Sequence, residues 1–230
     1  MRKPNRQSQP NRNRTAATMP DLSTMLPLFD NSETLVRINP PAVAVDCQPV
    51  YASAHNVLAH PLYNRLDCYL RPVAANALAL AASLAKEDGL SLRVFDAYRP
   101  VEAQYVFWDH TPDPDFVADP RLGSTHGRGI AVDLTLIDEQ KMPLPMGTEF
   151  DDFTIVAHHD YGDLPDEVIA NRHRLRGYME AAGFIIHAPE WWHYNLPDPN
   201  QYPLIHDGDA VPALLRPEMR ARADRTMKNF

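Results

Sequence analysis

The sequence predicts an α+β fold, in which a single domain has a small, mostly antiparallel sheet flanked by helices. Helix-like and strand-like segments follow one another without regular β-α-β alternation and without an internal repeat. A length of 230 residues suits one domain with long loops or terminal extensions better than two domains. The 22 prolines, against 9 glycines, indicate many irregular connections between the elements.

The composition divides the chain into three parts. Residues 1–18 are rich in Asn, Arg, Gln and Pro and lack hydrophobic periodicity, which predicts a disordered N-terminal tail. Residues 19–205 carry the periodic segments and are the predicted domain. Residues 206–230 form a C-terminal extension to which the sequence assigns no structure. The positive charges that gather at both ends of the chain are interpreted as solvated tails.

The first half of the domain begins with strand-like segments. Residues 42–45 alternate between alanine and valine and are followed by the segment at 49–52, so both are expected to be short strands. Pro72 suits the first turn of a helix that runs to Lys86, and Asp88 with Gly89 ends it. A strand is then expected at residues 90–95, and a helix that Pro100 opens runs to Trp108.

The second half of the domain alternates loops with regular elements. Gly183 follows a helix-like segment, and a turn at residues 188–190 separates two short strands. The expected elements are loops at 110–122 and 138–153, strands at 129–136, 184–187 and 192–196, and a helix at 165–182.

The charge and the hydropathy argue against several classes of protein. A formal net charge of −8 and a pI near 5.6 disfavour a nucleic-acid-binding protein, because phosphate neutralisation needs clustered Lys and Arg. No apolar stretch reaches the ~18 residues that cross a bilayer, and the basic start lacks the apolar region of a signal peptide. We therefore expect a cytoplasmic protein that acts on a small molecule and contacts no membrane. Oligomeric state has no signature in the sequence.

A histidine and a carboxylate lie seven residues apart in the segment from Ser124 to Asp133, with two glycines between them. On one regular strand, an odd offset points His126 and Asp133 to opposite faces. Joint binding of a metal ion therefore requires a bend, which Gly127 and Gly129 permit. We expect Asp133 to come from the strand and His126 from the turn before it.

A second segment places Glu190 three residues before His193, beside two tryptophans. Two histidines and an aspartate leave a fourth position open on zinc for water, as catalytic sites require. Glu190 then suits the role of general base for a water whose pKa the metal lowers toward ~7. The alternative is that His126 and His193 are hydrogen-bonded structural histidines and Asp133 is a carboxylate at a turn or strand edge.

The motif S-x-H-x-x-G-x-A-V-D at 124–133, followed by E-x-W-H at 190–193, resembles the signature of the D-Ala-D-Ala metallopeptidases. The D-x-Y-R-P element at 96–100 and the G-T-x-F-D block at 147–151 are similar to the vancomycin-resistance-type D-alanyl-D-alanine dipeptidases in particular. The resemblance covers roughly residues 38–200. It implies that residues 19–205 are a zinc peptidase domain with the metal in a cleft at the sheet.

The resemblance also implies a role for each matching residue. His126, Asp133 and His193 would bind one zinc ion per chain, Glu190 would be the general base, and Arg99 would stabilise the transition state. For the substrate, Asp151 and Tyr51 would bind the ammonium group, and Ser124 would donate to the backbone or the carboxylate. The implied reaction is hydrolysis of the dipeptide D-Ala-D-Ala to two D-alanines.

Two rival hypotheses use the same zinc site. A D,D-carboxypeptidase or peptidoglycan hydrolase would need an open cleft for a longer chain and is usually exported. A non-catalytic zinc-binding module would keep the metal for structure or partner binding, and the presence of Glu190 and Arg99 argues against it. Adjacent His158 and His159 point apart on an extended chain, so they are interpreted as loop histidines and not as a second metal site.

Overall fold

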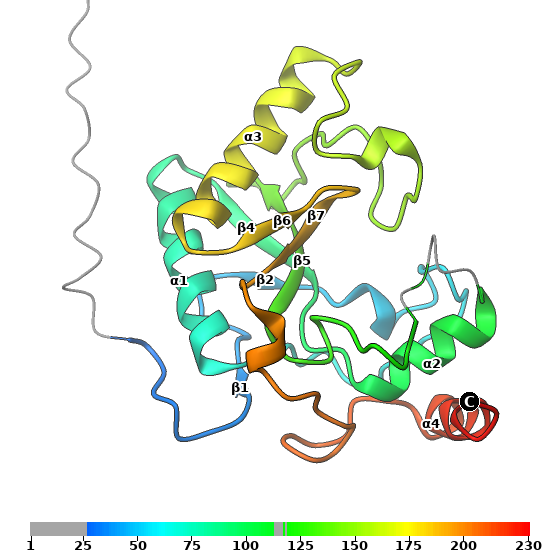
Figure 1. Ribbon diagram of the computed structural model, residues 1–230. Coiled ribbons are helices and arrows are strands. Elements are labelled where there is room, and N and C mark those ends of the chain that lie inside the picture. The colour runs from blue at the N-terminus through cyan, green and yellow to red at the C-terminus, as the bar shows by residue number, and fades with distance from the viewer. Residues whose placement is uncertain (1–26, 113–116, 118) are drawn as a thin grey trace, which may run out of the picture.

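The protein is described by a computed structural model that covers residues 27–112, 117 and 119–230 (Figure 1). The expected disordered tail at 1–18 lies outside these residues. The centre of the fold is a five-stranded sheet in the order β2-β4-β5-β7-β6. Its strands are β2 (Asp46–Cys47), β4 (Ser91–Asp96), β5 (Ala131–Ile137), β7 (Glu190–Asn195) and β6 (Ile185–His187).

Only β2 and β4 are parallel in this sheet, and the other three neighbouring pairs are antiparallel. A separate two-stranded antiparallel sheet joins β1 (Val36–Arg37) to β3 (Tyr69–Leu70). The predicted α+β fold with a small, mostly antiparallel sheet is confirmed.

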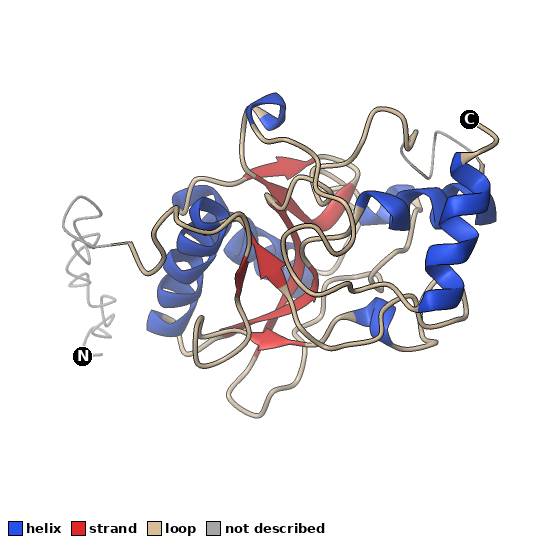
Figure 2. Cartoon of the chain, turned by 90° about the horizontal axis from the view of Figure 1, so that it is seen from below, coloured by secondary structure: helices blue, strands red, loops and turns tan. Residues whose placement is uncertain are grey.

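Two long helices cover one face of the large sheet (Figures 1 and 2). They are α1 (Pro72–Glu87) and α3 (Asp166–Ala181), and both pack against the sheet and against each other. Strand β5 is buried along its whole length, and its side chains alternate between the two faces. Leu134 faces the helices in the apolar core, whereas Asp133 points to the opposite face. That opposite face is where polar chemistry is possible.

The remaining helices lie on the other side of the molecule. They are α2 (Val101–His110) and α4 (Pro217–Met227), which pack against each other. The described residues also include the short 3-10 helices η2 (Val50–Ala52), η3 (Ile155–Ala157) and η4 (Pro199–Gln201). The helices expected at 72–86, 100–108 and 165–182 are confirmed, with Pro72 in the first turn of α1 and Gly89 just beyond its end at φ +73°.

Three expectations from the sequence are wrong. Residues 42–45 form a turn and a bend in place of a strand, because the backbone N–H groups of Ala42 and Val45 bond locally to the carbonyls of Asn39 and Val43, and strand β2 begins only at Asp46. Residues 49–52 form no strand but the 3-10 helix η2, because the carbonyl of Tyr51 accepts the backbone N–H groups of Leu62 and Tyr63 from a nearby loop. The C-terminal segment is not a solvated tail either, since α4 buries Ala223 against α2 and Arg222 forms an ion pair with Asp109 at 2.6 Å.

The C-terminal segment also binds the buried carboxylate of Glu102 in α2. Glu102 of α2 is 1% exposed and accepts hydrogen bonds from the His206 ring at 3.0 Å and the Asp207 backbone N–H at 2.9 Å. Arg220 of α4 lies 3.4 Å from the same carboxylate. A buried carboxylate is stable only with such partners, so residues 206–220 are part of the folded domain.

The bend that leads into β5 depends on one glycine more than on the other. Gly129 has φ +70°, and a Cβ there would lie 2.7 Å from Cδ2 of Leu35. Gly127 has no positive φ, and a Cβ there would meet its neighbours at 3.4 Å or more. The expectation of a glycine-permitted bend is therefore confirmed at Gly129, while Gly127 has no conformational need for glycine.

We predict that Gly129→Ala destabilises the protein by at least about 1–2 kcal/mol, because a Cβ disfavours the left-handed backbone conformation. Gly177→Ala is the matched control, since a Cβ at this position of α3 meets nothing within 4 Å and alanine favours helix by about 0.5–1 kcal/mol. The measurement is the melting temperature of metal-free protein, which should fall for Gly129→Ala and rise for Gly177→Ala. Equal melting temperatures for the two variants would contradict the assignment.

Candidate metal centre

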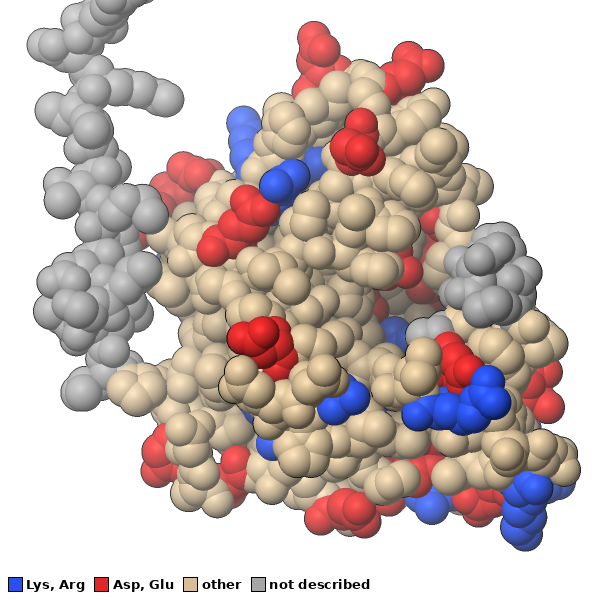
Figure 3. All heavy atoms as spheres, viewed as in Figure 1, with Lys and Arg blue, Asp and Glu red and all other residues tan. Residues whose placement is uncertain are grey.

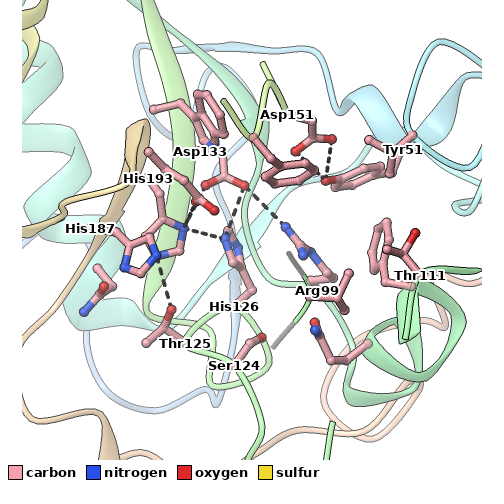
Figure 4. Close-up of a pocket in the computed structure, with 18 of the residues that line it drawn as sticks. Tyr51, Arg99, Thr111, Ser124, Thr125, His126, Asp133, Asp151, His187 and His193 are labelled. Carbon is pink, nitrogen blue, oxygen red and sulfur yellow. Dashed lines mark hydrogen bonds and ion pairs between the residues drawn. The ribbon is translucent and has the colours of Figure 1, made fainter. Parts of the chain in front are cut away.

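Three side chains converge on the face of the sheet that α1 and α3 leave open (Figure 4). Asp133 of β5 and His193 of β7 are register partners in the antiparallel pair, and His126 comes from the turn before β5. Asp133 Oδ2 lies 3.2 Å from His126 Nε2, and Asp133 Oδ1 lies 3.0 Å from His193 Nδ1. One ligand atom from each residue lies within 4.8 Å of the others, and all three residues are buried. The three predicted metal-binding residues are therefore brought together.

The second ring nitrogen of each histidine has its own partner. His126 Nδ1 lies 2.6 Å from the carbonyl oxygen of Ala97, and since a carbonyl only accepts, Nδ1 carries the proton. His193 Nε2 lies 3.3 Å from the Thr125 hydroxyl. His126 Nε2 and His193 Nδ1 face each other at 3.1 Å beside the carboxylate. Such outer hydrogen bonds hold metal-binding imidazoles in orientation, so the donor set fits a metal ion.

The electrostatics of the three groups also suit a cation. Burial acts to raise the pKa of Asp133, but the adjacent His126 and His193 lower it below its ordinary value. For His193, burial acts to lower the pKa, yet the hydrogen bond and charge of Asp133 raise it. Asp133 is therefore ionised throughout the physiological pH range and provides the negative charge that the site presents.

Glu190 lies next to the three converging side chains without joining them. It begins β7, is partly buried, and its Oε2 is 3.8 Å from His193 Nδ1. This distance exceeds a hydrogen bond, so the carboxylate is close to the candidate metal position but not committed to a ligand.

Arg99 is held in the same cavity by two carboxylates and two aromatic rings. Its Nε donates to Asp96 Oδ2 at 2.7 Å, and its Nη2 lies 3.4 Å from Asp133 Oδ2. The guanidinium carbon is 5.1 Å from the ring centres of both Tyr51 and Phe107. Asp96, which is 1% exposed, thus orients Arg99.

Apart from Asp96, the side chains described above line one cavity of about 520 Å³. Figure 3 shows the molecule hollowed on this face, with acidic and basic atoms visible inside the hollow. The polar and apolar side chains together form a pocket of the size that holds a small molecule. Its polar lining includes Tyr51, Arg99, Ser124, Thr125, His126, Asp133, Asp151, His187, Glu190 and His193.

Asp151 and Tyr51 form one end of the cavity. The Tyr51 hydroxyl donates to Asp151 Oδ2 at 2.9 Å and lies 3.2 Å from Oδ1. Burial raises the pKa of Asp151 to about 7, although the charge of Arg99 acts to lower it. The carboxylate is therefore kept in a poorly solvated position that an incoming cation would stabilise.

Ser124 also lines the cavity, but its hydroxyl has a structural role. Its Oγ accepts the backbone N–H of Gly127 at 3.1 Å, which fixes the turn that presents His126. The oxygen still has a proton to donate, so the expected contact with a substrate stays a prediction.

Several residues of the site have no signal in the sequence. Thr125 contacts His193, which is 68 residues further along the chain. Phe107, in α2, has its ring against the Arg99 guanidinium. His187 lines the cavity beside His193, yet a single histidine in a predicted strand has no metal-binding spacing. His158 and His159 lie in a loop outside the cavity lining, as expected, and Trp192 forms part of the cavity wall.

The comparison with known families agrees with this geometry. The family model Peptidase_M15, described as D-ala-D-ala dipeptidase, matches residues 34–208. The chain belongs to this family. It is a metallopeptidase, and the matched segment contains every residue of the candidate metal centre.

Three curated relatives of this M15 peptidase are named D-alanyl-D-alanine dipeptidase. The protein from Escherichia coli is 41% identical over 68% of this chain and 81% of its own length. The Enterococcus faecium protein is 34% identical over 56% of this chain and 74% of its own length. The Streptomyces coelicolor protein is 35% identical over 66% of this chain and 87% of its own length. Within the part of the chain that the structure describes, no helix is long and apolar enough to span a bilayer.

We predict that Asp151→Asn stabilises the metal-free peptidase at pH 8 more than at pH 5. A carboxyl group whose pKa is raised on folding favours the folded state at low pH, and this contribution is lost as the pH rises through about 7. Asparagine removes the cost of burying the charge and still accepts from Tyr51. Urea unfolding of both proteins at the two pH values measures the difference, and an advantage that is equal at both would contradict the raised pKa.

Proposed function

We propose that the peptidase hydrolyses the dipeptide D-Ala-D-Ala to two D-alanines with one zinc ion per chain. The observation that carries this proposal is the single cavity in which three converging donors lie beside Glu190, Arg99 and Asp151. The names of the three relatives agree with the same substrate.

His126, Asp133 and His193 would hold the metal ion through two nitrogens and a carboxylate. This donor set suits zinc and leaves a position open for water. When bound, zinc polarises the scissile carbonyl and lowers the pKa of the attacking water.

Glu190 would act as the general base. Its carboxylate lies beside the candidate metal position, 3.8 Å from His193 Nδ1, and makes no hydrogen bond to a ligand. It would take a proton from the attacking water and return it to the nitrogen of the departing D-alanine.

Arg99 would stabilise the negative charge that develops on the carbonyl oxygen. Asp96 and the rings of Tyr51 and Phe107 fix its guanidinium in place before the substrate arrives. A preoriented cation stabilises the transition state more than the uncharged carbonyl of the ground state.

Asp151 and Tyr51 would bind the substrate ammonium group, and Ser124 would donate to the peptide backbone or the carboxylate. A partly desolvated carboxylate is most stable when a cation pairs with it, so the free amino terminus of a dipeptide matches this end of the cavity. An N-acylated peptide has no charge to offer there. Selection for a dipeptide follows from this pairing.

The proposed activity predicts that purified protein cleaves D-Ala-D-Ala far faster than L-Ala-L-Ala or a pentapeptide ending in D-Ala-D-Ala. Treatment with a chelator should abolish cleavage, and added zinc should restore it. Release of free alanine is the measurement. Chelator-sensitive cleavage of the pentapeptide alone would establish the D,D-carboxypeptidase instead, and a zinc-loaded protein that cleaves none of the three would be a binding module.

We predict that Glu190→Gln lowers kcat for the dipeptide by roughly 10²–10⁴-fold, the usual contribution of a general base. Glutamine has nearly the same shape but does not take up the proton. Zinc content, measured by atomic spectroscopy, should equal that of the unmodified protein because Glu190 is not a ligand. A variant that keeps its activity would refute the base, and one that loses its zinc would make Glu190 a ligand.

A further inference from the structure

The residues of the cavity follow a definite order from one end to the other. Asp151 and Tyr51 lie at one end, and Arg99 stacks over the Tyr51 ring. Beyond Arg99 come Asp133 and then His193. Figure 4 shows the same order, with the metal-binding residues in the middle.

His187 lies at the other end of this series. Its ring packs edge-on against His193, with the ring centres 5.4 Å apart. Figure 4 shows it on the far side of His193 from Arg99 and Asp151. The cavity therefore has an acidic end at Asp151 and an imidazole at the opposite end.

A bound dipeptide needs a partner for its carboxylate at that opposite end. If its ammonium group pairs with Asp151 and its peptide bond lies at the metal position, its carboxylate extends past the metal-binding residues. A fully extended dipeptide spans up to about 7 Å, so its two charged ends are bound by separate groups. An ionised carboxylate in a partly closed cavity is costly unless hydrogen-bond donors satisfy it.

Two candidate donors in the described lining are already occupied. Arg99, its one Lys or Arg side chain, is paired with Asp96 and Asp133. The Asn195 amide donates to the Leu196 carbonyl at 2.8 Å.

His187 differs from these side chains in having donor capacity that nothing else uses. It makes no side-chain hydrogen bond to any residue that the structure describes, and its ring is exposed to the cavity. Residue 187 ends β6 and pairs with Glu190 across the hairpin, so the backbone fixes its position relative to the base. Burial lowers the pKa of His187, against the charge of Glu190, but even the neutral ring keeps one N–H donor.

We propose that His187 binds the C-terminal carboxylate of the substrate and makes the enzyme selective for peptides with a free C-terminus. The proposal rests on the proposed dipeptidase activity. It assigns the two charges of the dipeptide to two separate groups, with Asp151 at the amino end and His187 at the carboxyl end.

The test compares kcat/KM for D-Ala-D-Ala and for its C-terminal amide, which lacks the negative charge. The unmodified enzyme should prefer the free acid. His187→Ala should lower kcat/KM for the acid on the order of tenfold or more, the size of a hydrogen bond to a charged group, and leave the amide little changed. His187→Gln, which keeps an N–H donor, should recover part of the loss. His173→Ala, an exposed histidine of α3, is the matched control and should change neither substrate.

Two further measurements separate this role from others. Zinc content should be unchanged in His187→Ala, because loss of zinc would assign His187 to the metal centre and overturn the proposal.

Equilibrium binding of the acid and of the amide to Glu190→Gln, with and without His187→Ala, should show the same selectivity for the free acid without turnover. Equal losses for both peptides, or a preference that His187→Ala leaves intact, would also overturn it. If the unmodified enzyme cleaves no dipeptide, the proposed function fails, whereas the binding measurement still tests His187.

Discussion

The pairing of β5 with β7 is the constraint on which the candidate centre depends. In this register Asp133 lies opposite His193, and the same strand brings Glu190 to the edge of the cavity. A slip of one residue would turn Asp133 into the apolar core and expose Leu134 in its place, because strand side chains alternate between faces. The core of α1 and α3 therefore fixes the site, since only one register buries the apolar side chains of β5.

The buried charges of the site are stable because each is shared between neighbours. Asp96 receives hydrogen bonds from Arg99 and from the Tyr63 hydroxyl at 3.0 Å, and Arg99 reaches on to Asp133. Removing one member would leave another buried charge without a partner, which costs more than the pair contributes. Such a network holds the side chains in one arrangement. Asp151 is the exception, because only the Tyr51 hydroxyl and the more distant Arg99 stabilise its ionised form against the effect of burial.

The parts of the fold that the sequence predicts are those governed by local patterns. The alanine-rich α1 and the helix before Gly183 follow from periodicity and end signals, and His126, Asp133 and His193 follow from a motif with fixed spacing. What it misses depends on distant contacts. The 3-10 helix at Tyr51 forms because the backbone of Leu62 and Tyr63, in a loop further along the chain, bonds to the Tyr51 carbonyl, and α4 is ordered by packing on α2. Thr125 and His187 join the site only after β5 and β7 pair, so no local pattern marks them.

The chemistry and the selectivity of this enzyme are located on different kinds of structure. Asp133, His193 and the proposed base Glu190 are on central strands, where neighbouring strands restrict movement. The proposed partners of the substrate charges are on connections: Asp151 is in a loop with φ +62°, and His187 is the last residue of an edge strand. Loops accept changes in sequence that central strands do not. Substitutions at Asp151 or His187 would therefore change the proposed partners of the substrate charges while Asp133, His193 and Glu190 stay in place on their strands.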